Sequence, residues 1–281
     1  MKQGINGLTE GAEKPRVQNY SQLDNPEFEA IMALRTAAKE GAFFLPHLRQ
    51  GMRVLDVGCG PGSITVGLAE AVGPGDVVGI DLQASQVTKA QALQSSRGIT
   101  NLRFEVGDAN QLPFADGTFD AIFANSVLGH LRKPKQALEE MHRVLRPGGI
   151  VGVRDLDWGA RIHAPTTPLL DEWYSLTIRI RRRNGGNPFL GREHLRLLLD
   201  AGFETPKASV SVWSAGTREE IRLCASFLKA QLQGFASAAL AEGWMDQTKI
   251  DAVATEIDIW AGRKDSFYMD TYCEALARVH E

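Results

Sequence analysis

The sequence predicts an α/β protein built on a doubly wound, parallel sheet of about seven strands, with a mostly helical C-terminal cap inserted around the last strands. Short apolar runs alternate with amphipathic stretches, and a glycine-rich turn separates the first run from the next helix. From residue 158 onward the character changes, because all five tryptophans and three of the four tyrosines lie there. We therefore expect a flexible arm at 1–25, a core at 26–158, and a cap with the final strands at 159–281.

The first half of the chain predicts a repeated strand and helix order. Residues 1–25 are polar and rich in Gly, Asn and Gln, which is typical of a mobile arm. The apolar spacing predicts a helix from about Pro26 to His47 with a break at Gly41. Strands are then expected in RVLDVG, DVVGIDL, NLRFEVGD, FDAIFANSV and IVGVRDLD, with helices from Ser63, from Ala84 and over about 135–145. Such alternation indicates a parallel sheet covered on both faces.

The second half predicts the cap. Helical patterns lie near 166–183, 191–201, 217–240 and 245–262, with a strand near 205–214. The segment SFYMDTYCEALA alternates like a strand that returns to the sheet. The chain shows neither internal repeats nor low-complexity tracts, so we expect one fold with insertions.

Composition excludes several classes of protein. A formal net charge of -3 gives no broad attraction for nucleic acid or for an anionic membrane. No apolar run approaches the roughly 18 to 20 residues of a membrane span, and the N-terminus lacks the apolar core of a signal peptide. We expect a cytoplasmic protein that binds neither nucleic acid nor membrane.

Cysteine and histidine spacing does not favour a metal site. Cys59, Cys224 and Cys273 are widely separated, which indicates reduced thiols rather than a disulfide framework or a metal clip. The six histidines show no H-E-x-x-H spacing. We therefore expect no bound metal.

The glycine-rich turn is the central signal. Val54 to Gly62 is an apolar strand that ends in glycines directly before a helix, where a backbone can approach a ligand closely. A dinucleotide fingerprint needs a third glycine at the position of Ser63. The pattern therefore favours a nucleoside-like ligand without a pyrophosphate over NAD.

Carboxylates follow the next two expected strands. Asp81 ends the second strand, where it can accept hydrogen bonds from vicinal ribose hydroxyls or, alternatively, cap a helix. Asp108 and the backbone of Ala109 end the third strand, where they can read an adenine edge or form a turn. Asn125 begins the loop after the fourth strand, a position where chemistry is common in such sheets.

The segments VLDVGCGPG, VVGIDL, VGDANQLPF, DGTFDAIFANSVLGHL and ALEEMHRVLRPGGIVGVRD, in this order, resemble the class I S-adenosylmethionine-dependent methyltransferases, which have a Rossmann-like fold. The resemblance covers roughly residues 35–158 and is nearest to the ubiquinone and menaquinone biosynthesis-like branch, methyltransferase type 11. That branch includes many natural-product methyltransferases. The resemblance implies S-adenosylmethionine as cofactor and a small molecule as methyl acceptor.

The resemblance also implies which residues surround the cofactor. They are Asp56, Gly58 and Gly60 at the methionine part, Asp81 and Leu82 at the ribose, Asp108 and Ala109 at the adenine, Asn125 through its backbone at the amine, and Arg35 or Tyr20 at the carboxylate. Because the donor is a sulfonium, much of the rate comes from holding its methyl group in line with a nucleophile in a dry pocket.

Three residues are candidates for a general base. If the acceptor is a hydroxyl, a base is needed, and His130, Asp155 and Asp157 follow the fourth and fifth expected strands. His130 can instead cap a loop or pack on the cofactor, and either aspartate can cap the next helix. The basic run at 179–183 is interpreted as a solvated helix end, and the cap tryptophans as core residues of which one or two line a flat-substrate pocket.

Four functions compete at this point. A small-molecule methyltransferase, with O-methylation ahead of C-, N- or S-methylation, ranks first. A repurposed cyclase that binds the cofactor without methyl transfer is the main alternative. An arsenic methyltransferase, suggested by the three thiols, and a nicotinamide dehydrogenase rank below these. The acceptor and the oligomeric state stay open.

Overall fold

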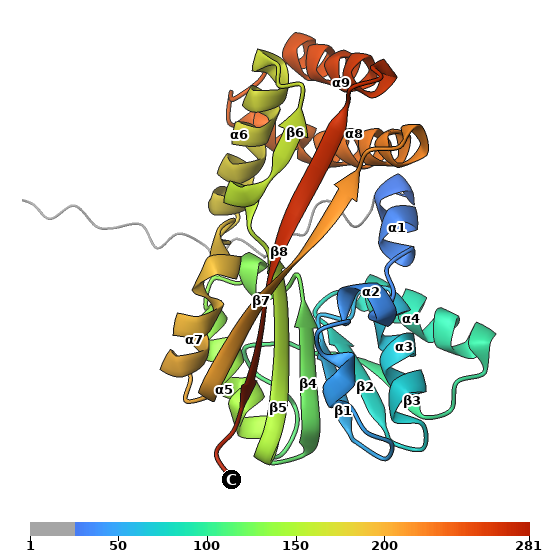
Figure 1. Ribbon diagram of the computed structural model, residues 1–281, viewed down its shortest axis with the longest axis vertical. Coiled ribbons are helices and arrows are strands. Elements are labelled where there is room, and N and C mark those ends of the chain that lie inside the picture. The colour runs from blue at the N-terminus through green and yellow to red at the C-terminus, as the bar shows by residue number, and fades with distance from the viewer. Residues whose placement is uncertain (1–25) are drawn as a thin grey trace, which may run out of the picture.

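A computed structural model describes residues 26–281 and contains one eight-stranded sheet (Figure 1). The strand order is β3-β2-β1-β4-β5-β8-β6, and β7 pairs with β8 on its other edge. The strands are β1 (Val54–Val57), β2 (Val77–Asp81), β3 (Leu102–Val106), β4 (Phe119–Asn125), β5 (Leu145–Leu156), β6 (Ile162–Ala164), β7 (Glu204–Ala215) and β8 (Phe267–Arg278). The first five are parallel, and the partners of β8 run antiparallel to it. The predicted α/β sheet is confirmed, with β6 as a short strand that the sequence reasoning missed.

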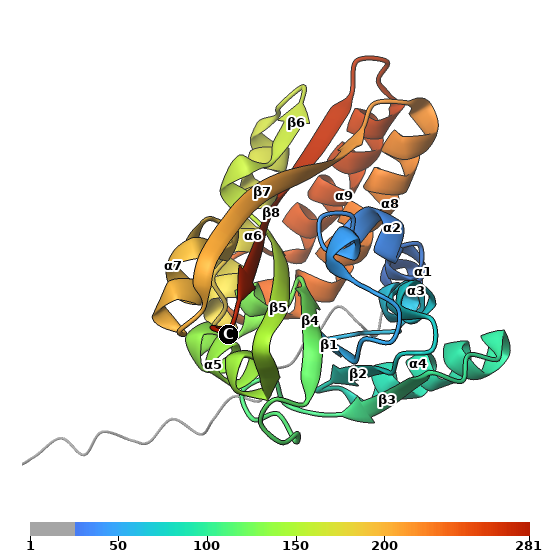
Figure 2. The same cartoon turned by 60° about the horizontal axis from the view of Figure 1, so that its bottom comes forward.

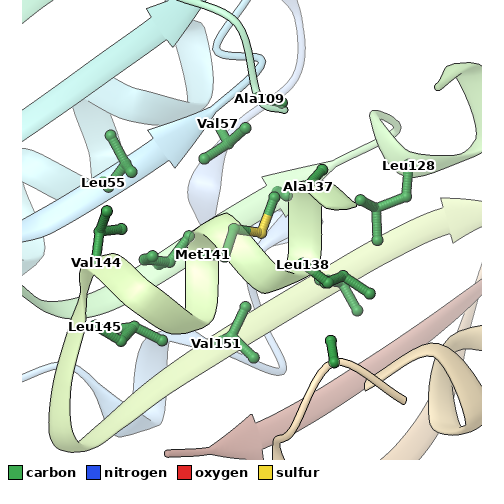
Figure 3. Packing of buried hydrophobic residues seen from close by; sticks show 14 of the residues in the cluster. Leu55, Val57, Ala109, Leu128, Ala137, Leu138, Met141, Val144, Leu145 and Val151 are labelled. Carbon is green, nitrogen blue, oxygen red and sulfur yellow. The ribbon is translucent and has the colours of Figure 1, made fainter. Parts of the chain in front are cut away.

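Helices cover both faces of the parallel part of the sheet because its strands are apolar on both sides. In β1, Val54 belongs to one core cluster and its neighbour Leu55 to another. The first cluster packs α3 (Ser63–Val72) and α4 (Ala84–Arg97) on the sheet. The second packs α5 (Pro134–Val144) and α7 (His194–Asp200), and Figure 3 shows α5 side chains such as Met141 pointing at the strands. This alternation is the physical basis of the doubly wound layout.

The segment before β1 differs from its prediction. Instead of one helix to His47 with a break at Gly41, the chain forms α1 (Pro26–Ala33), α2 (Ala37–Glu40) and a single 3-10 turn, η1 (Leu45–His47). The first break comes earlier, because Thr36 is extended and its hydroxyl accepts the backbone N–H of Lys39 as a helix N-cap.

The cap has a hydrophobic core of its own. It is formed by α6 (Pro168–Arg183), α8 (Arg218–Ala241) and α9 (Gln247–Gly262), with large buried side chains such as Trp173 and Trp260. Side-chain N-caps start all three helices, from Thr167, Thr217 and Asp246. Each of these three helices matches a helix predicted from the sequence to within a few residues.

The long strand β8 connects cap and sheet (Figures 1 and 2). Its C-terminal half pairs with β5, its N-terminal end with β6, and nearly its whole length with β7. Helix α8 of the cap packs against α1, next to the carboxyl ends of the parallel strands. Residues of both the sheet and the cap line one cavity. In the part of the chain that the structure describes, no helix has the length and apolar character needed to cross a membrane.

Candidate active site

A cavity of about 230 Å³ lies beyond the carboxyl ends of β1, β2, β4 and β5, where α/β sheets bind their ligands. Its walls come from two parts of the chain. The sheet side is formed by the glycine-rich turn and by the loops after β2, β3 and β4. The cap side is formed mainly by Trp158, Arg161, Arg181, Phe227, Gln231, Asp270 and Tyr272. One cavity is thus bounded by the sheet on one side and by the cap on the other.

The glycine-rich turn requires glycine at specific positions. Gly58 has a φ of +72°, and a Cβ there would lie 2.3 Å from Cγ2 of Val127. Gly60 has a φ of +54°, and a Cβ there would point into open space. The turn therefore exposes its backbone at the cavity while packing tightly against the loop after β4.

Asp56 lies beneath this turn. It is 3% exposed and its Oδ2 accepts a hydrogen bond of 2.6 Å from the hydroxyl of Thr65 on α3. Burial raises the pKa of Asp56 to about 7, and the nearby Asp81 charge acts in the same direction. Asp56 lines the cavity, so a cationic ligand group beside it would favour its charged form.

Asp81 is oriented by the backbone at the end of β2. Its Oδ2 accepts from the N–H of Gly60 and its Oδ1 from the N–H of Gln83, each at 2.9 Å. Burial raises its pKa, and the two backbone hydrogen bonds oppose that rise. A carboxylate oxygen can accept a second hydrogen bond, so this side chain ties the turn to β2 and still offers acceptors to a pair of hydroxyls. Leu82, half-exposed, lies next to it in the cavity wall.

The remaining cofactor candidates from the sheet also reach the cavity. Asp108 and Ala109 lie side by side in its wall, where Oδ1 of Asp108 accepts the N–H of Asn110 at 2.8 Å. Asn125 is buried, and its Oδ1 accepts from Nη1 of Arg154 at 3.0 Å. Asn125 thus lines the cavity with its side-chain oxygen held by Arg154.

Arg154 stabilises the region around Asn125. Its guanidinium makes an ion pair with Glu40 of α2 at 2.7 Å and stacks on the ring of Tyr272 at 3.6 Å. It therefore links β5, α2 and β8 around Asn125. Of the two residues expected at a ligand carboxylate, Arg35 lines the cavity, while Tyr20 lies outside the described residues.

The loop after β4 is strained and held in place. Ser126 has a φ of +59°, which is uncommon for a residue with a side chain and is often found at functional sites. Gly129 donates its N–H to Oδ1 of Asp155 at 3.0 Å and accepts the N–H of Asn187 at 2.9 Å. These bonds position His130, the next residue, in the cavity wall.

His130 is uncharged near neutral pH. Burial lowers its pKa well below the ordinary 6.5, and the positive charges of Arg181 and Arg35 lower it further. Nη1 of Arg181 lies 3.3 Å from both ring nitrogens. Both arginines are therefore close to the imidazole, and Arg181 contacts its ring nitrogens.

The two aspartates expected as alternative bases are engaged by other groups. Asp155 lines the cavity, but its Oδ1 accepts from Gly129 and its Oδ2 lies 3.1 Å from Nε2 of the buried His194. Asp157 is not part of the cavity wall. Both of its oxygens bind the guanidinium of Arg192, at 2.6 and 2.7 Å, and it caps the turn at Gly159. The structure thus brings His130 and Asp155 together and leaves Asp157 outside.

The sequence reasoning missed most of the cap wall. Arg161 and Asp270 form a buried ion pair, with Nε to Oδ1 at 2.6 Å and Nη2 to Oδ2 at 3.2 Å. The interpretation of 179–183 as a solvated helix end was wrong for Arg181, which lies in the cavity wall 4.1 Å from the ring of Trp158. No local motif marks these positions. One sequence signal could have indicated Arg181. Within the basic run 179–183 it lies at helical spacing from Trp173 and Thr177, which are on the buried face of α6.

The three thiols do not form a metalloid site. Cys59 and Cys224 are buried in different core clusters, and burial raises the pKa of both. Among residues 26–281, no group of three His, Cys, Asp or Glu side chains has the geometry to hold a metal ion.

Comparison with known proteins decides the family. The family described as "Methyltransferase domain" matches residues 48–177. An uncharacterised methyltransferase of Schizosaccharomyces pombe is 34% identical over 66% of this chain and 70% of its own length. The chain belongs to the methyltransferase family. A probable methyltransferase of Aspergillus luteorubrus is 29% identical over 93% of this chain and 98% of its own.

The same comparison includes a solved structure with a different activity. The [4+2]-cyclase SpnF is 25% identical, with a TM-score of 0.54, over 90% of this chain and 81% of its own. The matched family region contains the turn, the strand-end carboxylates and the loop at His130, all of which line the cavity. The predictions of family and enzyme class are therefore confirmed, and the matched family region includes the sheet side of the cavity.

Proposed function

We propose that this methyltransferase binds S-adenosylmethionine on the sheet side of the cavity and transfers the methyl group to an oxygen atom of a small molecule under the cap. A single observation carries the proposal. One cavity joins the glycine-rich turn and the strand-end carboxylates to His130 and the cap wall. The ligand supplies an activated methyl group, and the protein supplies orientation, exclusion of water and a proton acceptor.

The donor is assigned by the chemistry of the sheet side. Asp81 presents acceptors for the two ribose hydroxyls, and Asp108 with Ala109 forms the adenine end. The buried carboxyl of Asp56 faces the methionine end, where the ammonium group of the donor compensates its charge. Arg35 is the partner for the carboxylate of the donor.

His130 is the base that the geometry favours. Its imidazole lines the cavity and burial favours its uncharged form, whereas Asp157 lies outside the cavity wall and both oxygens of Asp155 are engaged by Gly129 and His194. The acceptor hydroxyl takes the place of the Arg181 contact at one ring nitrogen and gives its proton to the imidazole. The acceptor oxygen bonds to the methyl carbon as the carbon–sulfur bond of the donor breaks, which leaves the demethylated cofactor as a neutral thioether. Arg181, adjacent, stabilises the negative charge that develops on the acceptor oxygen. Asp155 acts as a positioning residue through Gly129.

Titration calorimetry tests the donor assignment. We expect micromolar binding of S-adenosylmethionine and of its demethylated product, and Asp81→Ala weakens it by about 10- to 150-fold, since a hydrogen bond to a charged group contributes about 1.5 to 3 kcal/mol. Asp76→Ala is the matched control, because Asp76 is exposed just before the opposite end of β2. Equal affinity in folded Asp81→Ala would refute the ribose assignment.

A cyclase that retains the cofactor without methyl transfer is the second candidate, supported by the likeness to SpnF over most of both chains. The two proposals differ in stoichiometry. A methyltransferase forms one demethylated cofactor for each product molecule, whereas a cyclase forms none. Incubation with labelled cofactor and candidate acceptors separates them. The cytoplasmic location stays a prediction.

A further inference from the structure

Gln231 in α8 is a buried polar side chain without a partner. It is 2% exposed and lines the cavity. Its Oε1 is fully buried and accepts no hydrogen bond from any group in residues 26–281. Buried side-chain amides are normally paired, because leaving water without a compensating hydrogen bond costs free energy. A group outside residues 26–281, such as one on a bound ligand, is therefore expected at this position.

The surroundings of Gln231 place it on the cap side of the cavity, where we propose that the methyl acceptor binds. Phe227, one helical turn earlier, lines the same cavity from the same face of α8. Cys224, two turns before Gln231 on that face, is close enough to Asp270 and Arg161 for their charges to act on its thiol. α8 thus contributes a wall that extends from the Arg161 ion pair toward α1, opposite the sheet.

The charge of this wall is balanced. Arg161 is neutralised by two hydrogen bonds to Asp270, which also accepts from the hydroxyl of Tyr268. The other positive groups of the cavity, Arg35 and Arg181, are close to His130. A charged ligand group beside Gln231 would be desolvated without a counter-charge, which is unfavourable. The group that binds Gln231 is therefore neutral.

We infer that the methyl acceptor is a hydroxylated, largely apolar ring compound whose second hydroxyl, remote from the methylated oxygen, donates a hydrogen bond to Gln231. The inference rests on the proposed function. A hydroxyl fits because it satisfies either end of the amide, whichever way the terminal group is rotated. The ring fits because Phe227, Trp158 and Tyr272 form much of the remaining wall. Gln231 thereby selects acceptors that carry the second hydroxyl over analogues that lack it.

Paired probes test this inference. One is a naphthalenediol with a hydroxyl on each ring, and the other is the naphthol that lacks the second hydroxyl. Calorimetry is performed on full-length protein saturated with S-adenosylhomocysteine. We expect the wild type to bind the diol about 2- to 13-fold more tightly than the naphthol, as a neutral hydrogen bond predicts. Gln231→Met removes this preference, and Gln233→Met, an exposed change on the same helix, retains it.

Stability and cofactor affinity distinguish recognition from a structural role. Because Gln231→Met replaces an unpaired polar group with an apolar one of similar size, its melting temperature is equal to or above that of the wild type, with unchanged S-adenosylhomocysteine affinity. Lower stability or weaker cofactor binding overturns the assignment to the acceptor. If wild type and Gln231→Met prefer the diol over the naphthol to the same extent, or if neither probe binds, the inference about Gln231 is wrong and the proposed function is unaffected. Failure of the wild type to bind S-adenosylhomocysteine overturns the proposed function instead.

Discussion

The two halves of the cavity are built in different ways. The sheet half uses short segments, each at the end of one strand, and holds its key carboxylate with backbone N–H groups of Gly60 and Gln83. The cap half uses side chains that meet across long separations, such as Arg161 and Asp270, which are 109 residues apart. Local motifs can therefore specify the sheet half of the cavity, whereas the cap half depends on how the cap folds over the sheet.

Deleting residues 265–281 breaks the connection between the halves and has the largest expected effect. This deletion removes β8, which pairs with β5, β6 and β7 and contributes the buried Tyr268 to the cap core. We expect loss of cooperative folding, because three strands lose their partner and expose unpaired edges. Circular dichroism during thermal unfolding is the measurement.

A shorter deletion is the control for that experiment. Removing only residues 280–281, which lie beyond β8, leaves all strand pairs intact and is expected to leave folding unchanged. If the longer deletion yields a soluble monomer that unfolds cooperatively, the last strand is peripheral and the two halves fold independently of it.

Replacing His130 tests the chemistry at the boundary between the halves. His130→Gln removes the proposed base, and we expect turnover with the true acceptor to fall by about 100- to 10,000-fold. Cofactor affinity, measured by calorimetry, is expected to stay near that of the wild type because Asp56, Asp81 and Asp108 are unchanged. Asp157→Asn serves as the comparison, since Asp157 lies outside the cavity wall and its change is expected to affect stability more than turnover.

The pH profile of the wild type sharpens this test. A base must be unprotonated, and the pKa of His130 lies well below 6.5. The acidic limb of kcat/KM is therefore expected below that value, so activity persists at a pH where an ordinary histidine is charged. A limb at or above 6.5 that disappears in His130→Gln would contradict the assigned environment of the imidazole.

The pH dependence of stability at Asp56 tests how well the sheet half is buried, and it is the smallest of the expected effects. Its pKa is about 7 in the folded protein and near 3.8 in a solvated carboxyl. Between these values the folded protein holds a proton that the unfolded chain has lost, so its free energy of unfolding falls as pH rises. Relative to Asp56→Asn, the wild type is expected to lose roughly 2 to 3 kcal/mol between about pH 5 and about pH 8.

Urea unfolding without ligand at the two pH values gives this difference directly. Asn keeps an oxygen that can accept the Thr65 hydrogen bond, so the comparison isolates ionisation. An equal stability difference at both pH values would show that Asp56 ionises normally and that water reaches it beneath the turn.

Errors of prediction were concentrated where local patterns and tertiary contacts compete. The helix expected up to Gly41 ended earlier, because Thr36 caps a new helix with its own hydroxyl. No apolar run in the sequence marks the short strand β6, which forms because it pairs with β8. The cap helices were predicted well, since long amphipathic segments with capping residues carry their own signal.

The sequence by itself determined the α/β order and the glycine turn. It also determined the positions of Asp56 and Asp81 near the ends of β1 and β2, and of Asp108 and His130 in the loops after β3 and β4, because each follows from the local pattern of one strand, turn and helix. Tertiary structure decided the rest. It separated Asp155 and Asp157, which differ by two positions, by binding one to His194 at the cavity and the other to Arg192 away from it. It also brought Gln231 into the cavity without a partner. Burial, charge balance and hydrogen bonding at these positions depend on segments distant in the chain, and no local pattern encodes them.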